Sequence, residues 1–173
     1  MQDNQREALL KYAYIAGIID GEGSIMITRS CSGYKRKTPS YTPRVKVGMT
    51  ERHCLDFIVE HTGIGTVTDE GVRKSHRDGC NRKGFFQWQV HSLTNVPKFL
   101  EMIAPFLVLK RPQAELILMY CACFDKQKKC MDGVPDDVRA FREETYNKMR
   151  KLNGRKAPAT TKPRSNREVE AIV

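Results

Sequence analysis

The feature that most constrains this chain is an apolar helical run that ends in two acids and three glycines. Residues 15–23 read IAGIIDGEG, and apolar side chains recur at three- and four-residue steps from Glu7 to Ile19. This period predicts an amphipathic helix. Because glycine favours helix ends, we expect the helix to stop at Gly21 and Gly23.

Small residues form a line along the predicted helix. Ala13, Gly17 and Gly21 are spaced by four and share one face, where another backbone can approach closely. A glycine inside a helix costs about 1 kcal/mol relative to alanine, so some contact must offset that cost. The sequence contains one such segment, and we expect its partner to be the same segment of a second copy, related by a two-fold axis.

Alternating apolar and polar residues after this helix predict strands. Two alternating segments come first, then a second helix, then two more alternating segments, and finally further helices. We expect strands at 24–30, 44–50, 66–68 and 85–91, and helices at 53–61, 94–103 with Thr94 as its cap, 112–124, and from Asp136 or Asp137 onward. This order predicts an α+β fold of type αββαββα, with a four-stranded antiparallel sheet covered by helices on one face.

Length and apolar content indicate one globular unit. A chain of 173 residues builds one hydrophobic core, so we expect a single domain over residues 1–153. The basic segment 154–173 has no apolar period, and we expect it to be mobile or to order on a partner.

Without a bilayer-length apolar run or a targeting pattern, we expect a soluble protein of a prokaryotic cytoplasm or an organelle matrix or stroma. Scattered cysteines without metal-site spacing indicate reduced thiols.

The charge balance points to a polyanionic partner. Lys and Arg number 30 against 20 Asp and Glu, a net charge of +10, which favours a nucleic acid. The outer face of the predicted sheet is polar and basic, and a strand ribbon of this kind fits the DNA major groove. The alternative is that an antiparallel sheet simply leaves one face in water. On that face, the expected DNA-binding residues are Ser24, Met26, Thr28, Ser30, Arg44, Lys46, Gln87 and Gln89. Gly48, Phe85 and His91 lie on the same face. At the hairpin tips, the expected DNA-binding residues are Lys35, Arg36, Lys37, Arg73, Lys74, Arg77, Arg82 and Lys83.

Two acids stand at the carboxyl end of the first helix. A helix ends with unpaired carbonyls and a partial negative charge, so Asp20 and Glu22 are electrostatically misplaced there. If two copies pair along the glycine line, their Glu22 carboxylates converge, and Mg²⁺ is the partner that makes such a cluster favourable. Metals held against phosphates promote phosphodiester hydrolysis. The alternative is that both acids only cap a turn before the strand.

The same segment resembles the LAGLIDADG motif of the homing endonucleases. The match covers Ala16, Gly17, Ile19, Asp20 and Gly23. The predicted order of helices and strands is also similar to this family's fold over most of residues 7–125. One motif in a chain of this length resembles the homodimeric branch, which implies a saddle-shaped DNA-binding sheet and the motif helix at the dimer interface, with Ala13, Gly17, Asp20 and Gly21 in contact.

The resemblance also implies roles for individual residues. Glu22, where aspartate is commoner, becomes a metal ligand, and Gly21 supplies a backbone carbonyl to the metal. Lys110 follows a segment similar to one in this family that brings a basic residue to the scissile phosphate, so the resemblance implies that Lys110 is this catalytic basic residue. Glu51 takes the place of a polar residue that orders solvent, with Arg52 as a further catalytic candidate. The implied cofactor is Mg²⁺, whose sites also accept Mn²⁺ or Ca²⁺.

The implied activity is site-specific cleavage of both DNA strands across the minor groove of a long pseudo-palindromic target, leaving short 3′ overhangs. Half-sites read by two-fold related sheets lie roughly 10 base pairs apart. The alternative is a binding protein on the same scaffold without cleavage, either an intron maturase that acts on RNA or a DNA-binding regulator. The carboxylate at 22 and the lysine at 110 argue for retained chemistry.

Overall fold

The helix, two-strand, helix, two-strand order expected from the sequence is present in the structure, a computed structural model that describes residues 2–30, 39–71, 84–124 and 134–154. The elements are α1 (Gln2–Glu22), β1 (Gly23–Ser30), β2 (Ser40–Met49), α2 (Arg52–Thr62), β3 (Thr66–Asp69), β4 (Phe86–His91), α3 (Asn95–Ile103), the 3-10 turn η1 (Ala104–Phe106), α4 (Arg111–Phe124) and α5 (Asp136–Leu152). The predicted α+β class and the αββαββα order are therefore confirmed, with α4 and α5 added after the last helix of that pattern.

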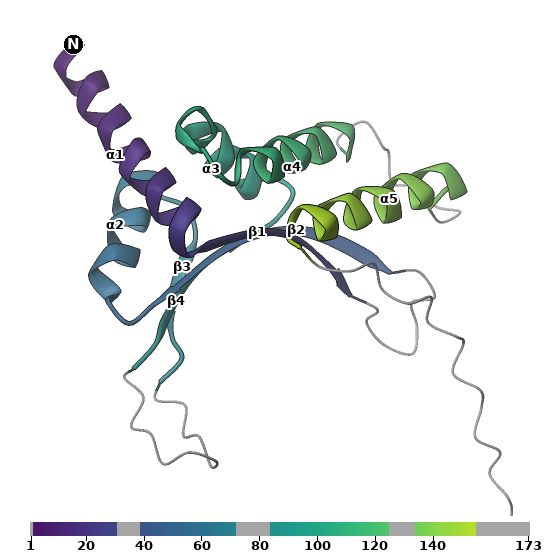
Figure 1. Cartoon of the computed structure of the whole chain (residues 1–173), viewed down its shortest axis with the longest axis horizontal. Coiled ribbons are helices and arrows are strands. Elements are labelled where there is room, and N and C mark those ends of the chain that lie inside the picture. The colour runs from purple at the N-terminus through teal and green to yellow at the C-terminus, as the bar shows by residue number, and fades with distance from the viewer. Residues whose placement is uncertain (1, 31–38, 72–83, 125–133, 155–173) are drawn as a thin grey trace, which may run out of the picture.

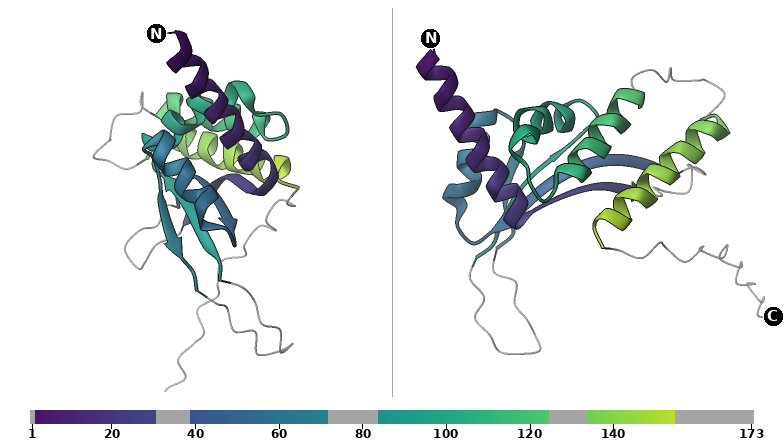
Figure 2. Two further views of the ribbon diagram at one scale, coloured as in Figure 1. Left: turned by 90° about the vertical axis from the view of Figure 1, so that its left-hand side faces the viewer. Right: turned by 45° about the horizontal axis from the view of Figure 1, so that its top comes forward.

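The four strands form one antiparallel sheet in the order β1-β2-β4-β3. The sheet is curved, and the described helices gather on its convex side and leave its concave side open (Figure 1). Figure 2 shows the same arrangement from two other directions, with α1 crossing one end of the sheet and α5 the other. None of the described helices is long and apolar enough to cross a membrane.

The predicted alternation places the core under the helices. Ile25, Val45, Val47, Trp88 and Val90 are all at most 3% exposed. They pack against buried residues of α1, α2, α3 and α4. Burying one such side chain contributes about 1.5–3 kcal/mol, so this face fixes the register of every strand.

Gly65 shows how closely one loop approaches this core. Its φ is 91°, and a Cβ built on it would lie 2.4 Å from the indole nitrogen of Trp88. That nitrogen donates a hydrogen bond to the carbonyl of Ile64 at 3.1 Å. The glycine therefore lets the loop after α2 cover the largest buried ring.

The start of β2 differs from the prediction. We expected a strand from 44, yet β2 begins at Ser40, and both Tyr41 and Pro43 are buried. Residues 40–43 pair with β1 alone, so the missing N–H of Pro43 falls where β2 has a neighbour on one side only. Tertiary contacts hold this extension, because the Tyr120 hydroxyl donates to the Tyr41 carbonyl at 3.1 Å and the Tyr41 ring packs on Tyr146.

The ends of two helices also differ from the prediction. Gly21 does not end α1, which continues through Glu22 and passes directly into β1. The strand leaves so closely that a Cβ on Gly23 would lie 2.6 Å from the Ile19 carbonyl oxygen, which is why glycine stands at 23. Thr94 is the N-cap residue of α3, as predicted, but its side chain makes no capping hydrogen bond. The Ser92 hydroxyl accepts the N–H groups of residues 94 and 95 in its place, at 3.3 and 2.8 Å.

Candidate active site and nucleic-acid interface

Glu22 lies at the junction of α1 and β1. Its side chain is exposed and makes no hydrogen bond or ion pair with the described part of the chain. Because Gly23 pairs with Val47, Glu22 sits at the edge of the sheet where β2 ends. The last turn of α1 contains no basic residue, so its own sequence leaves this negative end uncompensated.

Asp20, two residues earlier, turns its carboxylate toward a distant part of its own chain. It accepts the backbone N–H groups of Val108, Leu109 and Lys110 at 2.7, 3.2 and 2.8 Å. Burial by itself raises the pKa of Asp20, but these three hydrogen bonds, with the charge of Lys110, outweigh it and hold the pKa below 3.8. Asp20 therefore works as an anionic cap for the segment that leads into α4.

Lys110 in turn contacts the backbone at the end of α1. Its ammonium donates to the carbonyl of Ile19 at 2.9 Å and to the carbonyl of Asp20. The lysine supplies the positive charge that the end of α1 lacks, while the acid of α1 binds the lysine's own backbone. This reciprocal contact, the Asp20–Lys110 clamp, holds an ammonium group at the helix end from which Glu22 projects.

The oxygen donors at this end of α1 suit a hard divalent cation. The exposed Glu22 carboxylate, with the backbone carbonyl of Gly21, is the kind of ligand that Mg²⁺, Mn²⁺ and Ca²⁺ take. Within the described ranges of a single chain, no group of three or more His, Cys, Asp or Glu side chains lies together to hold a metal ion. These residues therefore fit a metal whose remaining ligands come from a second copy, from phosphate oxygens and from water.

Glu51 and Arg52 lie just beyond the end of β2. Glu51 is exposed at the N-cap position of α2 and makes no side-chain capping hydrogen bond. Arg52 is engaged by its own chain, since its Nε pairs with Asp56 at 3.1 Å and its guanidinium lies 5.9 Å from the centre of the Phe86 ring. The structure leaves Glu51 available beside the Glu22 end of the sheet and gives Arg52 a structural partner.

The face of α1 that carries the small residues has no partner in the described chain. Gly17 and Gly21 are exposed, and a Cβ built on either would meet nothing within 4 Å. Leu10 and Tyr14, on adjoining turns, are 65% and 55% exposed, although the Tyr14 ring also meets Phe57 of α2 edge to face at 5.3 Å, while Ala13 is partly buried. Exposed apolar side chains beside bare backbone are the surface that a closely packed second helix covers.

The concave face of the sheet carries the predicted DNA-reading residues in rows. Ser24 lies beside Lys46 and Gln89, and Met26 beside Arg44 and His91, with Gln87 beside Gly48.

The Nε of Arg44 is buried and has no hydrogen-bond partner among the described residues. Thr28 donates to the Thr42 carbonyl at 3.0 Å and Ser30 shares a hydrogen bond with Ser40 at 2.7 Å, so these two hydroxyls are partly used. The hairpin-tip residues Lys35, Arg36, Lys37, Arg73, Lys74, Arg77, Arg82 and Lys83 lie outside the described residues.

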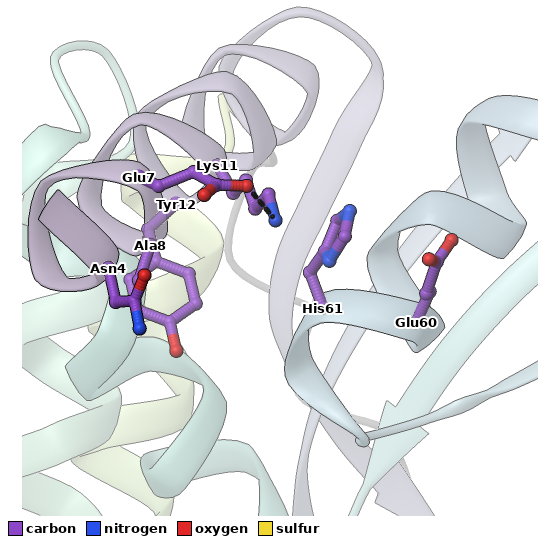
Figure 3. Close-up of a pocket in the computed structure, with 7 residues that line it drawn as sticks. All are labelled: Asn4, Glu7, Ala8, Lys11, Tyr12, Glu60 and His61. Carbon is purple, nitrogen blue, oxygen red and sulfur yellow. Dashed lines mark ion pairs between the residues drawn. The ribbon is translucent and has the colours of Figure 1, made fainter.

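The pocket in Figure 3 lies between α1 and α2 and is separate from this site. It encloses about 320 Å³ and includes the Glu7–Lys11 ion pair at 2.8 Å, with Tyr12 and His61 nearby. At 1.5 Å per residue, Tyr12 is about 15 Å along the helix from Glu22. The pocket is therefore too far from the Glu22 carboxylate to belong to the same site.

The partner of Asp20 was missed from the sequence. We expected Asp20 to line the dimer contact or to cap the turn before the strand, and nothing in the local pattern points to residues 108–110. The seat of the Phe85 ring over Gly48 was missed as well. A glycine diagonal to an aromatic residue on the neighbouring strand is the signal that could have revealed this second contact.

Comparison with known proteins supports what the fold and the motif indicate. No family model matches the chain. The DNA endonuclease I-CreI of Chlamydomonas reinhardtii is 34% identical over 107 residues, which cover 61% of this chain and 58% of that enzyme. The match thus spans less than two thirds of the relative's length.

Solved structures of homing endonucleases share the fold. I-CvuI, in complex with the I-CreI target at 2 mM Mg and with the DNA not cleaved, matches with a TM-score of 0.66 and 23% identity over 90% of this chain and 87% of that one. The archaeal intron-encoded I-Vdi141I, complexed with DNA, matches with a TM-score of 0.62 and 17% identity over 83% and 84%. These similarities show that the chain has the fold of the homing endonucleases, and its IAGIIDGEG segment at the end of α1 resembles their LAGLIDADG motif.

Proposed function

We propose that this protein is a homodimeric, divalent-metal-dependent endonuclease that cuts both strands of a specific DNA target. The observation that carries the proposal is the exposed Glu22, which has no polar partner among the described residues, at the end of a helix whose Gly17 and Gly21 face meets no other described residue. The proteins it resembles are endonucleases, and one of them, I-CvuI, was solved on DNA in the presence of Mg and in the presence of Ca. We assign this activity to a single domain over residues 1–153.

The dimer forms by close pairing of two α1 helices along Gly17 and Gly21. A two-fold axis on that face brings together the two Glu22 carboxylates and the carbonyl ends of both helices. Two acids so close repel each other unless cations neutralise them. The pairing therefore also builds the metal site, with Glu22 of each copy and the Gly21 carbonyl as ligands.

DNA lies against the concave sheet face of each copy. Arg44, Lys46, Gln87 and Gln89 carry the donors and acceptors that read base edges in the major groove. Each half-site takes one sheet, and the central base pairs present their minor groove to the paired Glu22 residues. The target is therefore a pseudo-palindrome of about two helical turns.

The reaction at the centre is hydrolysis of a phosphodiester bond. Water attacks phosphorus, the bridging P–O bond breaks, and a hydroxyl end and a phosphate end result. The chemistry supplied by a divalent metal at Glu22 is neutralisation of charge on the phosphate and activation of water. Lys110, fixed by the Asp20–Lys110 clamp, adds a positive charge for the developing negative charge, and Glu51 hydrogen-bonds the solvent beside the site.

The test is the substitution Glu22→Gln in the full chain. A target is first selected by sequencing the cleavage products of a randomised duplex library with Mg²⁺. The variant removes a carboxylate charge and keeps the side-chain shape, so we expect specific binding to remain within about threefold and the cleavage rate to fall at least about 100-fold. Glu101→Gln, at an exposed carboxylate on α3, is the matched control and keeps the full rate.

Full cleavage by the Glu22→Gln variant would contradict the metal-ligand role. Binding of DNA or RNA by the native chain without any metal-dependent nicking of the library would favour the maturase or regulator alternative instead.

A further inference from the structure

An aromatic ring occupies an otherwise polar part of the concave sheet face. Val47 is fully buried toward the helices, so the next residue, Gly48, faces the concave side. A Cβ built on Gly48 would lie 2.2 Å from Cζ of Phe85, and 2.9 and 3.2 Å from its two Cε atoms. The ring edge therefore rests directly on the backbone of β2, in the space that any other residue at 48 would fill.

The position of the Phe85 ring over Gly48 is fixed by contacts of its own backbone as well as by β2. Phe85 precedes β4, and its carbonyl accepts the N–H of Glu70 at 2.9 Å, which holds its backbone against the β3 side. Phe85 is half-buried, so part of the residue remains accessible to solvent. Its neighbours there, Lys46 and Gln87, present charged or hydrogen-bonding ends.

The ring lies near the cleavage end of the sheet. Because Gly23 pairs with Val47, Gly48 comes beside the junction where Glu22 leaves α1. A base pair that meets Phe85 is consequently among those nearest the centre of the proposed target. The remaining reading residues on this face, from Lys46 to Arg44, lie progressively further from that centre.

We propose that Phe85, which packs over Gly48, selects a base carrying a C5 methyl group in the major groove at the base pairs of each half-site that lie nearest the centre of the target. This inference rests on the proposed binding of DNA to the concave face. In the major groove the C5 methyl of thymine is the apolar group that distinguishes it from cytosine, and an apolar side chain recognises it by contact. Lys46 and Gln87 read only polar edges, so the ring adds a selectivity that its neighbours lack.

The test uses uracil, which differs from thymine only by the missing methyl. In the selected target, each thymine is replaced in turn by uracil, and the affinity of the full chain is measured by fluorescence anisotropy with Ca²⁺. We expect central uracil substitution to weaken binding by about fourfold per half-site, the value of burying one methyl group. A 5-methylcytosine at the same position should be preferred over cytosine.

Two variants assign this effect to the ring. Phe85→Ser should bind the thymine and uracil targets equally, and Gly48→Ala, which displaces the ring, should do the same. Phe86→Leu is the matched control, since Phe86 pairs with Met49 on the opposite parity of the strand, and it should keep the fourfold difference.

The outcomes separate the two proposals. A selected target that has no central preference for a methylated base, or a uracil effect that persists in Phe85→Ser, overturns the role of Phe85 and leaves the endonuclease proposal standing. A chain that selects no duplex sequence at all overturns both.

Discussion

At the scale of single residues, the Asp20–Lys110 clamp is the contact on which the site depends. One carboxylate binds three backbone N–H groups, and one ammonium binds two backbone carbonyls, so each residue satisfies the other's main chain. The two residues are 90 positions apart, and no short window of sequence reveals that they meet. The motif predicts that Asp20 is structurally important, while its partner is visible only in three dimensions.

Asp20→Asn tests this contact through its pH dependence. A lowered pKa in the folded state means that the carboxylate stabilises the protein fully above 3.8 and stops doing so as the pH falls through the folded value. At pH 7 the variant should lose about 1–2 kcal/mol of unfolding free energy, measured by urea denaturation. The difference from the native chain should shrink below pH 3.8.

Glu101→Gln serves as the control for this measurement, because its exposed carboxylate should change stability by less than about 0.5 kcal/mol. A loss in Asp20→Asn that stays constant from pH 7 to pH 3 would show that the charge of Asp20 plays no part in the clamp.

Lys110→Met separates the structural role of the lysine from its chemical role. Removing the ammonium leaves two carbonyls at the end of α1 without their donor, which should cost about 1 kcal/mol of stability. If Lys110 also stabilises charge on the phosphate, the cleavage rate should fall about 100-fold at a temperature where the variant is fully folded. Circular dichroism checks the folding, and an unchanged rate would restrict Lys110 to the structural role.

At the scale of elements, α1 has two faces with opposite requirements for glycine. Gly23 is required by the chain itself, because a Cβ there would lie 2.6 Å from a backbone oxygen of Ile19. Gly17 is not required by the described part of the chain, since a Cβ there would meet none of its atoms within 4 Å. Glycine inside a helix lowers its stability by about 1 kcal/mol relative to alanine, so a contact outside the chain accounts best for Gly17.

Gly17→Leu should therefore leave the monomer folded and disrupt the dimer. We expect the native chain to sediment as a dimer and the variant as a monomer in analytical ultracentrifugation, with helix content unchanged. Ala140→Leu adds the same side chain at an exposed position of α5 and should remain dimeric. Gly23→Ala should instead lower the stability of the monomer itself. A stable, active Gly17→Leu dimer would refute pairing along this line.

The elements themselves follow closely from periodicity, because alternation and helical spacing report which side chains face the core. The errors lie where tertiary contacts override local signals. Tyr41 and Pro43 resemble a loop in the sequence, yet α4 and α5 cover them and extend β2. Gly21 resembles a helix stop, but α1 continues because the strand follows directly at Gly23.

At the scale of the whole molecule, the proposed function assigns the basic residues to two kinds of DNA contact. Arg44 and Lys46 stand on the concave sheet face, where the proposed DNA would present its base edges, whereas we expect the hairpin-tip cations to contact phosphates. Base contacts set specificity, and phosphate contacts set affinity and its salt dependence. A chain with a net charge of +10 should therefore bind DNA with a steep salt dependence. The residues that set this salt dependence should differ from those that set the sequence specificity.

Lys46→Gln and Lys37→Gln distinguish these two classes. Lys46→Gln should relax selectivity at one base pair in each half-site and leave binding to unrelated DNA nearly unchanged. Lys37→Gln should weaken binding to every sequence and reduce the slope of log K against log salt by about 2 per dimer, one released counterion from each copy. Lys98→Gln, at an exposed position of α3 on the helix-covered side, should alter neither quantity. If Lys98→Gln lowers the slope as much as Lys37→Gln does, the DNA does not lie against the concave face, because charges on both sides of the sheet would then contribute equally.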